Sequence, residues 1–195
     1  MRERGVHTAL ALLAGSLALM WALEVADQAG DLDLERLGIE PRDPAGLFGI
    51  VFAPFIHGSY AHLVSNTVPL VIFGTVIALG GVRRLLTVTL ICGLSAGLGT
   101  WVTAESGSIH VGASGIIFGY ASFLMVRGLY TRDVFHVLTG VLVFLFYGGT
   151  ILLATMPAPG ISWQGHLFGA LGGVFAAAWE ARTPEPQTEQ REVTG

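Results

Sequence analysis

The chain has 195 residues, of which 52% are hydrophobic and only 12% are charged, and its formal net charge at pH 7 is −4. Soluble domains carry about 25% charged residues, so this composition excludes an ordinary soluble globular domain. It predicts an integral membrane protein whose main solvent is lipid. The small negative charge, without a basic cluster, argues against a nucleic-acid partner. A single cysteine, Cys92, excludes an internal disulfide.

Six apolar stretches are long enough to cross a bilayer core, which takes about 20 residues. They lie at about 6–25, 60–79, 83–102, 112–129, 135–154 and 163–179. The first follows two arginines, as in a signal peptide, but it is longer than the apolar core of such a peptide, so we expect it to remain as a span. The sequence therefore predicts an all-α polytopic membrane protein with one six-span domain over residues 1–182. We expect residues 183–195, which are polar, to form a disordered cytoplasmic tail.

The connection between the first two spans, residues 26–59, is the one long loop. Its first part is acidic, and its later part contains the apolar run Leu47–Phe52. This run is too short to cross the bilayer, so we expect it to lie in the interface or to re-enter the protein.

The arginines predict the orientation of the chain, because the chain has no lysine. Only Arg36 and Arg42 lie in the long loop. The other eight lie at the two termini and in the second-to-third and fourth-to-fifth connections: Arg2, Arg4, Arg83, Arg84, Arg127, Arg132, Arg182 and Arg191. The positive-inside rule therefore predicts cytoplasmic termini and an external first loop, which agrees with an even number of spans.

This orientation places four polar residues near the outer ends of three spans. Ser114 lies in the first turn of the fourth span, His166 in the first turn of the sixth, and His62 and Asn66 in the first two turns of the second. At 1.5 Å per residue, their depths differ by roughly 3–10 Å. Polar side chains at membrane depth usually face the bundle interior, which makes these residues candidates for a functional site.

These four residues are of the types that hydrolysis by a serine nucleophile requires. A serine hydroxyl needs a base to take its proton, and histidine is the side chain best matched to that task near neutral pH. The oxyanion that forms needs hydrogen-bond donors held in advance. Backbone N–H groups near Ser114, the Asn66 amide and a ring N–H of His62 are candidates for this role.

Glycines on the fourth and sixth spans predict close packing between them. Gly112 and Gly115 let the backbone approach closely around Ser114. The small-xxx-small spacing recurs on both spans, at Gly115 and Gly119 and at Gly165, Gly169 and Gly173. This spacing favours close helix contact in membranes, which would bring Ser114 and His166 together.

In combination these motifs resemble the rhomboid intramembrane serine proteases. The resemblance rests on Gly112-Ala113-Ser114-Gly115, on His57-x4-His62-x3-Asn66 and on Gly165-His166-x2-Gly169, and it covers about 55–177. It implies a dyad in which Ser114 is the nucleophile and His166 the general base, with an oxyanion hole lined by His62 and Asn66. His57, Gly112 and Gly115 would support the site.

The same resemblance implies the substrates and the location. The substrates would be transmembrane proteins, cut within or next to a membrane-spanning segment without a metal or another cofactor. The protein would be a multi-pass component of the cell membrane, in direct contact with the lipid bilayer. The sequence indicates neither a natural substrate nor an oligomeric state.

Two features depart from the family pattern. Rhomboids often carry a tyrosine four residues after the serine, where its ring packs under the histidine, and this chain has Phe118. Many members also carry a Trp-Arg pair in the long first loop, and residues 26–59 contain none. Ring packing survives the first change, whereas the second leaves the role of the loop open.

Other interpretations of these residues remain. A catalytically silent relative would bind transmembrane helices without cutting them. A metal-dependent hydrolase would use His57, His62 and His166, but the chain lacks an HExxH pair or a carboxylate at ligand spacing. The remaining histidines, His7, His110 and His136, are most simply interpreted as packing residues. We expect the fifth span and the loop 155–162 to admit substrate, since Gly148-Gly149 and a short loop lower the cost of movement.

Overall fold

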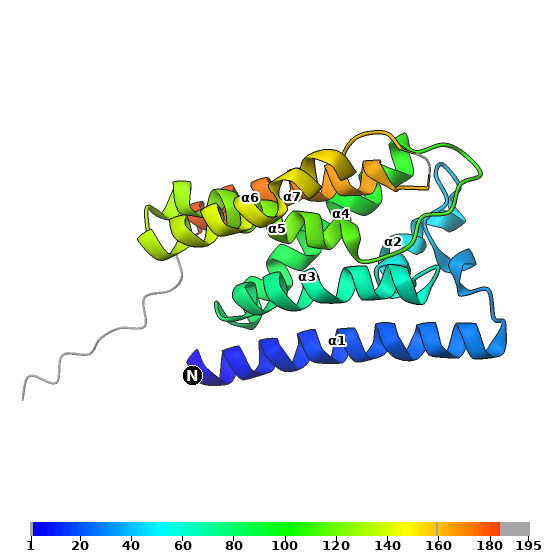
Figure 1. Cartoon of the computed structure of the whole chain (residues 1–195), viewed down its shortest axis with the longest axis horizontal. Helices are drawn as coiled ribbons and strands as arrows, with labels where there is room; N and C mark the ends of the chain where they lie inside the picture. Colours follow the sequence, from blue (N-terminus) through cyan, green and yellow to red (C-terminus); the bar gives the residue numbers. More distant parts are fainter. Residues whose placement is uncertain (1, 159, 184–195) are drawn as a thin grey trace, which may run out of the picture.

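The computed structural model describes residues 2–158 and 160–183, and six long helices make up most of this part of the chain (Figure 1). They are α1 (Arg2–Gly30), α3 (Tyr60–Ala78), α4 (Val82–Thr103), α5 (Ser114–Thr131), α6 (Val134–Ala154) and α7 (Trp163–Arg182). Each coincides with one predicted apolar stretch to within a few residues, and the all-α prediction is confirmed. The predicted tail lies outside the described residues, except for Thr183.

Four of these helices, α1, α3, α4 and α6, are long and apolar enough to cross a membrane. The other two, α5 and α7, are not among the helices that length and composition alone mark as able to cross a membrane. They are also well buried, with ten buried residues in α5 and seven in α7. Their polar and small side chains therefore face protein more than lipid.

The helices form a bundle with α1 and α6 on opposite sides (Figure 1). The start of α1 and the end of α7 lie at one end of this bundle. The segments 31–59, 104–113, 155–158 and 160–162 lie at the opposite end, which we call the loop end. Helices α5 and α7 both begin at the loop end, so the first turns of both helices lie there.

Glycines bring α5 and α7 into backbone contact, as their spacing predicted. A Cβ atom added to Gly169 would lie 2.0 Å from the carbonyl oxygen of Gly115, and one added to Gly173 would lie 1.9 Å from that of Gly119. Only glycine fits at such separations. The two helices that carry Ser114 and His166 are therefore held closely together.

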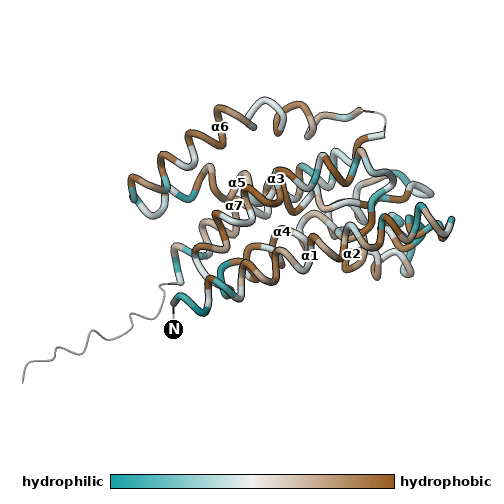
Figure 2. The backbone as a smooth tube through the Cα atoms, turned by 60° about the horizontal axis from the view of Figure 1, so that its bottom comes forward, coloured by the Kyte–Doolittle hydropathy of each residue, from teal (hydrophilic) through white to brown (hydrophobic). Residues whose placement is uncertain are grey.

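Helix α6 packs on the bundle mainly through its first half. Gly140 lies against the carbonyl oxygen of Met125, since a Cβ there would come within 2.6 Å of it. Farther along, Tyr147 meets Phe73 of α3 edge to face, with ring centroids 4.8 Å apart. Most of its large apolar side chains face outward, and Figure 2 shows α6 as an apolar helix at the edge of the bundle.

The first loop contains short helical turns, η1 (Leu34–Leu37), η2 (Ala45–Leu47), α2 (Gly49–Phe52) and η3 (Ala53–Phe55). It is tied to the rest of the loop end by a backbone bridge between Ile39 and His110. The backbone N–H of Arg42 donates to the carbonyl of Trp101, whose indole N–H donates to the carbonyl of Asp43. A tryptophan and an arginine are therefore in contact at the loop end, but the tryptophan belongs to α4 and not to the first loop.

Candidate active site

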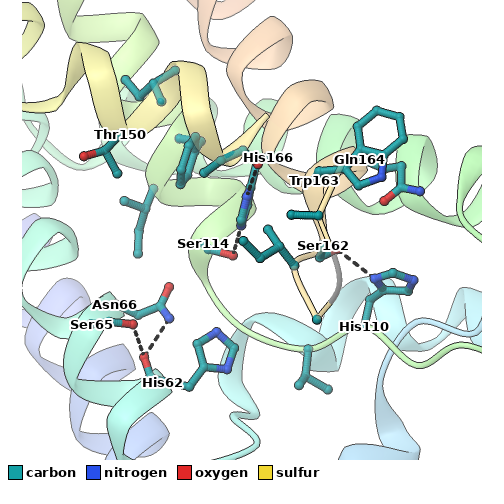
Figure 3. Close-up of a pocket in the computed structure, with 18 of the residues that line it drawn as sticks. His62, Ser65, Asn66, His110, Ser114, Thr150, Ser162, Trp163, Gln164 and His166 are labelled. Carbon is teal, nitrogen blue, oxygen red and sulfur yellow. Dashed lines mark hydrogen bonds between the residues drawn. The ribbon is translucent and has the colours of Figure 1, made fainter. Parts of the chain in front are cut away.

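Ser114 and His166 meet at the loop end. The hydroxyl oxygen of Ser114 lies 2.8 Å from Nε2 of His166, although the two residues are 52 positions apart (Figure 3). Ser114 is the first residue of α5, and His166 lies in the first turn of α7 with 8% of its surface exposed. The pair therefore sits where two closely packed helices begin.

The other ring nitrogen of His166 has its own partner. Nδ1 lies 2.9 Å from the carbonyl oxygen of Ala154, the last residue of α6. A carbonyl only accepts, so Nδ1 carries the hydrogen, and in a neutral ring Nε2 then accepts from the hydroxyl of Ser114. This is the tautomer that a general base requires. Ala154 carries no sequence signature, because its contribution is a carbonyl at the end of a helix, where backbone acceptors lack helical partners.

The Phe118 ring fixes the plane of the His166 imidazole. The two rings are stacked, with centroids 4.3 Å apart and planes 6° from parallel. Phe118 is one helical turn after Ser114, so both side chains lie on the same face of α5. The Ser114 hydroxyl and the ring that stacks on His166 are thus supplied by a single helix face.

His62 and Asn66, one turn apart on α3, line the same cavity as Ser114 and His166. One N–H of the Asn66 amide donates to the carbonyl of His62 at 2.9 Å. The His62 ring lies against Gly112, where an added Cβ would come within 2.7 Å of the ring. Gly112 also has a φ of +108°, which L side chains rarely adopt. Glycine is therefore required at this position on two separate grounds.

His57 lies behind His62 rather than on the cavity wall. The two rings meet edge to face with centroids 5.0 Å apart, and His57 is 1% exposed. Burial, and to a lesser degree the neighbouring His62, lowers the pKa of His57 to about 4. His57 is therefore neutral at pH 7, and its structural contact is with His62.

The cavity over Ser114 and His166 has a volume of about 760 Å³ and lies between α3, α5, α6 and the segments of the loop end. Its polar part includes Ser108, His110 and Ser162, and its apolar wall includes Phe73 and Tyr147. It falls within the range of about 300–1,000 Å³ that is usual for ligand pockets. Within residues 2–158 and 160–183, no group of three or more His, Cys, Asp or Glu side chains is arranged to hold a metal ion.

Comparison with known proteins places the chain in a family. The family model of the Rhomboid domain matches residues 44–182. The chain is 42% identical over 170 residues to the uncharacterised protein Rv1337 of Mycobacterium tuberculosis, covering 83% of this chain and 70% of that protein. It is 39% identical over 188 residues to the uncharacterised protein ML1171 of Mycobacterium leprae, covering 92% and 74%.

A named protease is also similar to the chain. Identity to the rhomboid protease GluP of Bacillus subtilis is 30% over 130 residues, which cover 63% of this chain and 24% of GluP. Members of this family are generally serine intramembrane proteases that act on membrane proteins within the bilayer. The extent of the domain match shows that this chain, an apolar bundle of helices, belongs to the rhomboid family of integral membrane proteins.

Proposed function

We propose that this protein is a serine endopeptidase that hydrolyses peptide bonds within or next to transmembrane segments of membrane proteins. The observation that carries the proposal is the 2.8 Å hydrogen bond between Ser114 and His166, with Nδ1 of His166 held by the carbonyl of Ala154. Two hydrogen bonds thus link the proposed nucleophile to its base and the base to an orienting group.

The first chemical step follows from this geometry. Nε2 of His166 takes the hydroxyl proton of Ser114 as its oxygen attacks the substrate carbonyl. The imidazolium that forms is stabilised by Ala154, because the carbonyl end of a helix carries partial negative charge. His166 then gives its proton to the leaving amine. A water molecule hydrolyses the acyl-enzyme with His166 again acting as base.

The oxyanion would lie near the start of α5. The first N–H groups of a helix have no intrahelical partner, and Ser114 is the first residue of α5. The Asn66 amide and the His62 ring line the same cavity and would supply further donors. Phe118 would keep the imidazole in plane during proton transfer.

We propose six membrane spans, with both termini in the cytoplasm and the loop end at the outer face of the cell membrane. The arginine distribution supports this orientation. The position of the start of α1 and the end of α7 at one end of the bundle agrees with it (Figure 1). In this arrangement residues 1–182 form one membrane domain, and water reaches Ser114 from outside. The chemistry uses no metal or other cofactor.

Substrates would reach the cavity between α3 and α6. The contact of Phe73 with Tyr147 joins these helices beside the cavity, whereas α6 packs elsewhere chiefly on α5. Outward movement of α6 and of the loop 155–162 would therefore open a lateral path from the lipid.

The direct test uses purified protein in liposomes with a single-span membrane substrate. We expect cleavage that is abolished by Ser114→Ala and by His166→Ala and is unaffected by a chelator. A serine-directed covalent probe should label the peptide that contains Ser114. Cleavage by Ser114→Ala at the parental rate would refute the proposal. Binding of transmembrane peptides by the parent, without cleavage or labelling, would instead indicate a catalytically silent relative.

A further inference from the structure

A second hydrogen bond between a histidine and a serine lies beside the dyad. Nδ1 of His110 is 2.8 Å from the hydroxyl oxygen of Ser162 (Figure 3). His110 is four residues before Ser114, and Ser162 is four residues before His166. Both bonds therefore span 52 positions and join the same two segments of chain. The sequence pattern assigned His110 to packing, whereas the structure places it on the cavity wall.

The direction of the bond can be derived from its neighbours. The hydroxyl of Ser108 donates to the carbonyl of Glu105, and its oxygen lies 2.9 Å from Nε2 of His110. Since Ser108 has only one proton to give, Nε2 of His110 is the donor between them. Nδ1 of a neutral His110 then accepts the proton of Ser162. Burial lowers the pKa of His110, which favours this neutral form.

Ser162 connects this bond to the base. It precedes the first residue of α7, where a serine side chain commonly accepts from a helix N–H. Its hydroxyl makes no such cap and is bonded to His110 instead. Its backbone carbonyl accepts the N–H of His166 at 3.1 Å. A displacement of Ser162 would therefore move the first turn of α7 and His166 with it.

The backbone of His110 is fixed separately. Its N–H donates to the carbonyl of Ile39 at 3.0 Å, and its carbonyl accepts the N–H of Ile39 at 2.9 Å. His110 is thus bonded through its backbone to the first loop and through its side chain to the start of α7. It anchors α7 to a segment that is itself held in place.

We propose that His110 is a positioning residue that, through Ser162, holds the start of α7 at the distance from α5 that the Ser114–His166 bond requires. This inference rests on the proposed function. Catalytic geometry is sensitive, because a displacement of about 1 Å can cost on the order of 100-fold in rate. The expected effect of losing the anchor is therefore on turnover more than on substrate binding.

The test compares His110→Ala, Ser162→Ala and the double variant in liposomes. We expect each single change to lower kcat by about 10- to 100-fold with KM changed by less than about threefold. The double variant should be no slower than the slower single variant, because both changes remove one interaction. Ser106→Ala is the matched control. Its hydroxyl lies in the same segment but bonds Arg42 rather than α7, and kcat should not change.

Two conservative variants separate positioning from general stability. In His110→Asn the amide oxygen falls near the position of Nδ1 and can accept from Ser162, whereas in His110→Gln the amide group falls near Nε2. We expect His110→Asn to recover most of the lost kcat and His110→Gln to recover little. Equal kcat for His110→Asn and His110→Ala, additive losses in the double variant, or a kcat for His110→Ala within about twofold of the parent would each overturn the inference.

Hydrogen–deuterium exchange tests the same inference without proteolysis. In His110→Ala the backbone amides of residues 163–166 should exchange faster than in the parent, and His110→Asn should restore their protection. Unchanged exchange there would overturn the inference even if the parent cleaves substrate. If the parent protein neither cleaves the substrate nor is labelled by the serine-directed probe, the proposed function is refuted. Hydrogen–deuterium exchange at the start of α7 would still decide whether His110 anchors that helix.

Discussion

Nδ1 of His166 lies 2.9 Å from the carbonyl oxygen of Ala154, so the His166 ring is oriented by a backbone carbonyl and not by a carboxylate. A carbonyl cannot become protonated or move as a side chain does. The orientation of His166 therefore depends on where α6 ends. If α6 moves outward to admit substrate, His166 loses this partner until α6 returns, which would couple the closure of α6 to the proposed reaction.

We predict that the neutral ring of His166 carries its hydrogen on Nδ1. In ¹⁵N NMR spectra at neutral pH, Nδ1 of His166 should be protonated and Nε2 should be unprotonated, because the Ala154 carbonyl accepts only from Nδ1–H. Ser114→Ala should shift the Nε2 resonance and leave the tautomer unchanged. A ring protonated at Nε2 in both proteins would contradict the assignment of His166 as base.

Asn66 should contribute to turnover. If its amide stabilises the oxyanion, Asn66→Ala should lower kcat by about 10²–10³-fold with little change in KM. Ser65→Ala is the control, since the Ser65 hydroxyl donates to the same His62 carbonyl. We expect this control to retain kcat within a few-fold. A similarly small effect of Asn66→Ala would assign that residue to helix packing.

Contact between α5 and α7 should not tolerate a methyl group. In Gly169→Ala the new Cβ would meet the Gly115 carbonyl at 2.0 Å, so the helices must separate. We expect a loss of about 1–3 kcal/mol in the free energy of unfolding and a fall in kcat. Gly15→Ala is the matched control in α1, because an added Cβ there meets nothing within 4 Å. Thermal unfolding of both variants in one detergent should show a lower midpoint for Gly169→Ala alone.

The long helices and the contact between α5 and α7 could be predicted from the sequence, because lipid imposes a length on each span and close packing requires glycine. The number of spans and the distribution of arginines predicted that Ser114 and His166 lie at the same level. Ala154 could not be predicted, since any residue offers a carbonyl. Nor could the His110–Ser162 bond, because the partner of a serine hydroxyl depends on how distant segments meet. The contact between Arg42 and Trp101 was not predicted for the same reason. A Trp-Arg pair was expected only within the first loop, whereas Trp101 lies in α4.

His57 makes stability depend on pH. Its pKa is about 4 in the folded protein, against 6.5 for an unperturbed histidine, so between these values the unfolded chain binds more protons than the folded one. Stability should therefore fall as pH decreases from 6.5 to 4, by up to about 3 kcal/mol from this residue. His57→Leu should lose this part of the dependence, whereas the exposed His7→Leu should keep it. Unfolding midpoints measured across this range for the three proteins check the sign, and parallel curves for the parent and His57→Leu would show that His57 does not titrate on unfolding.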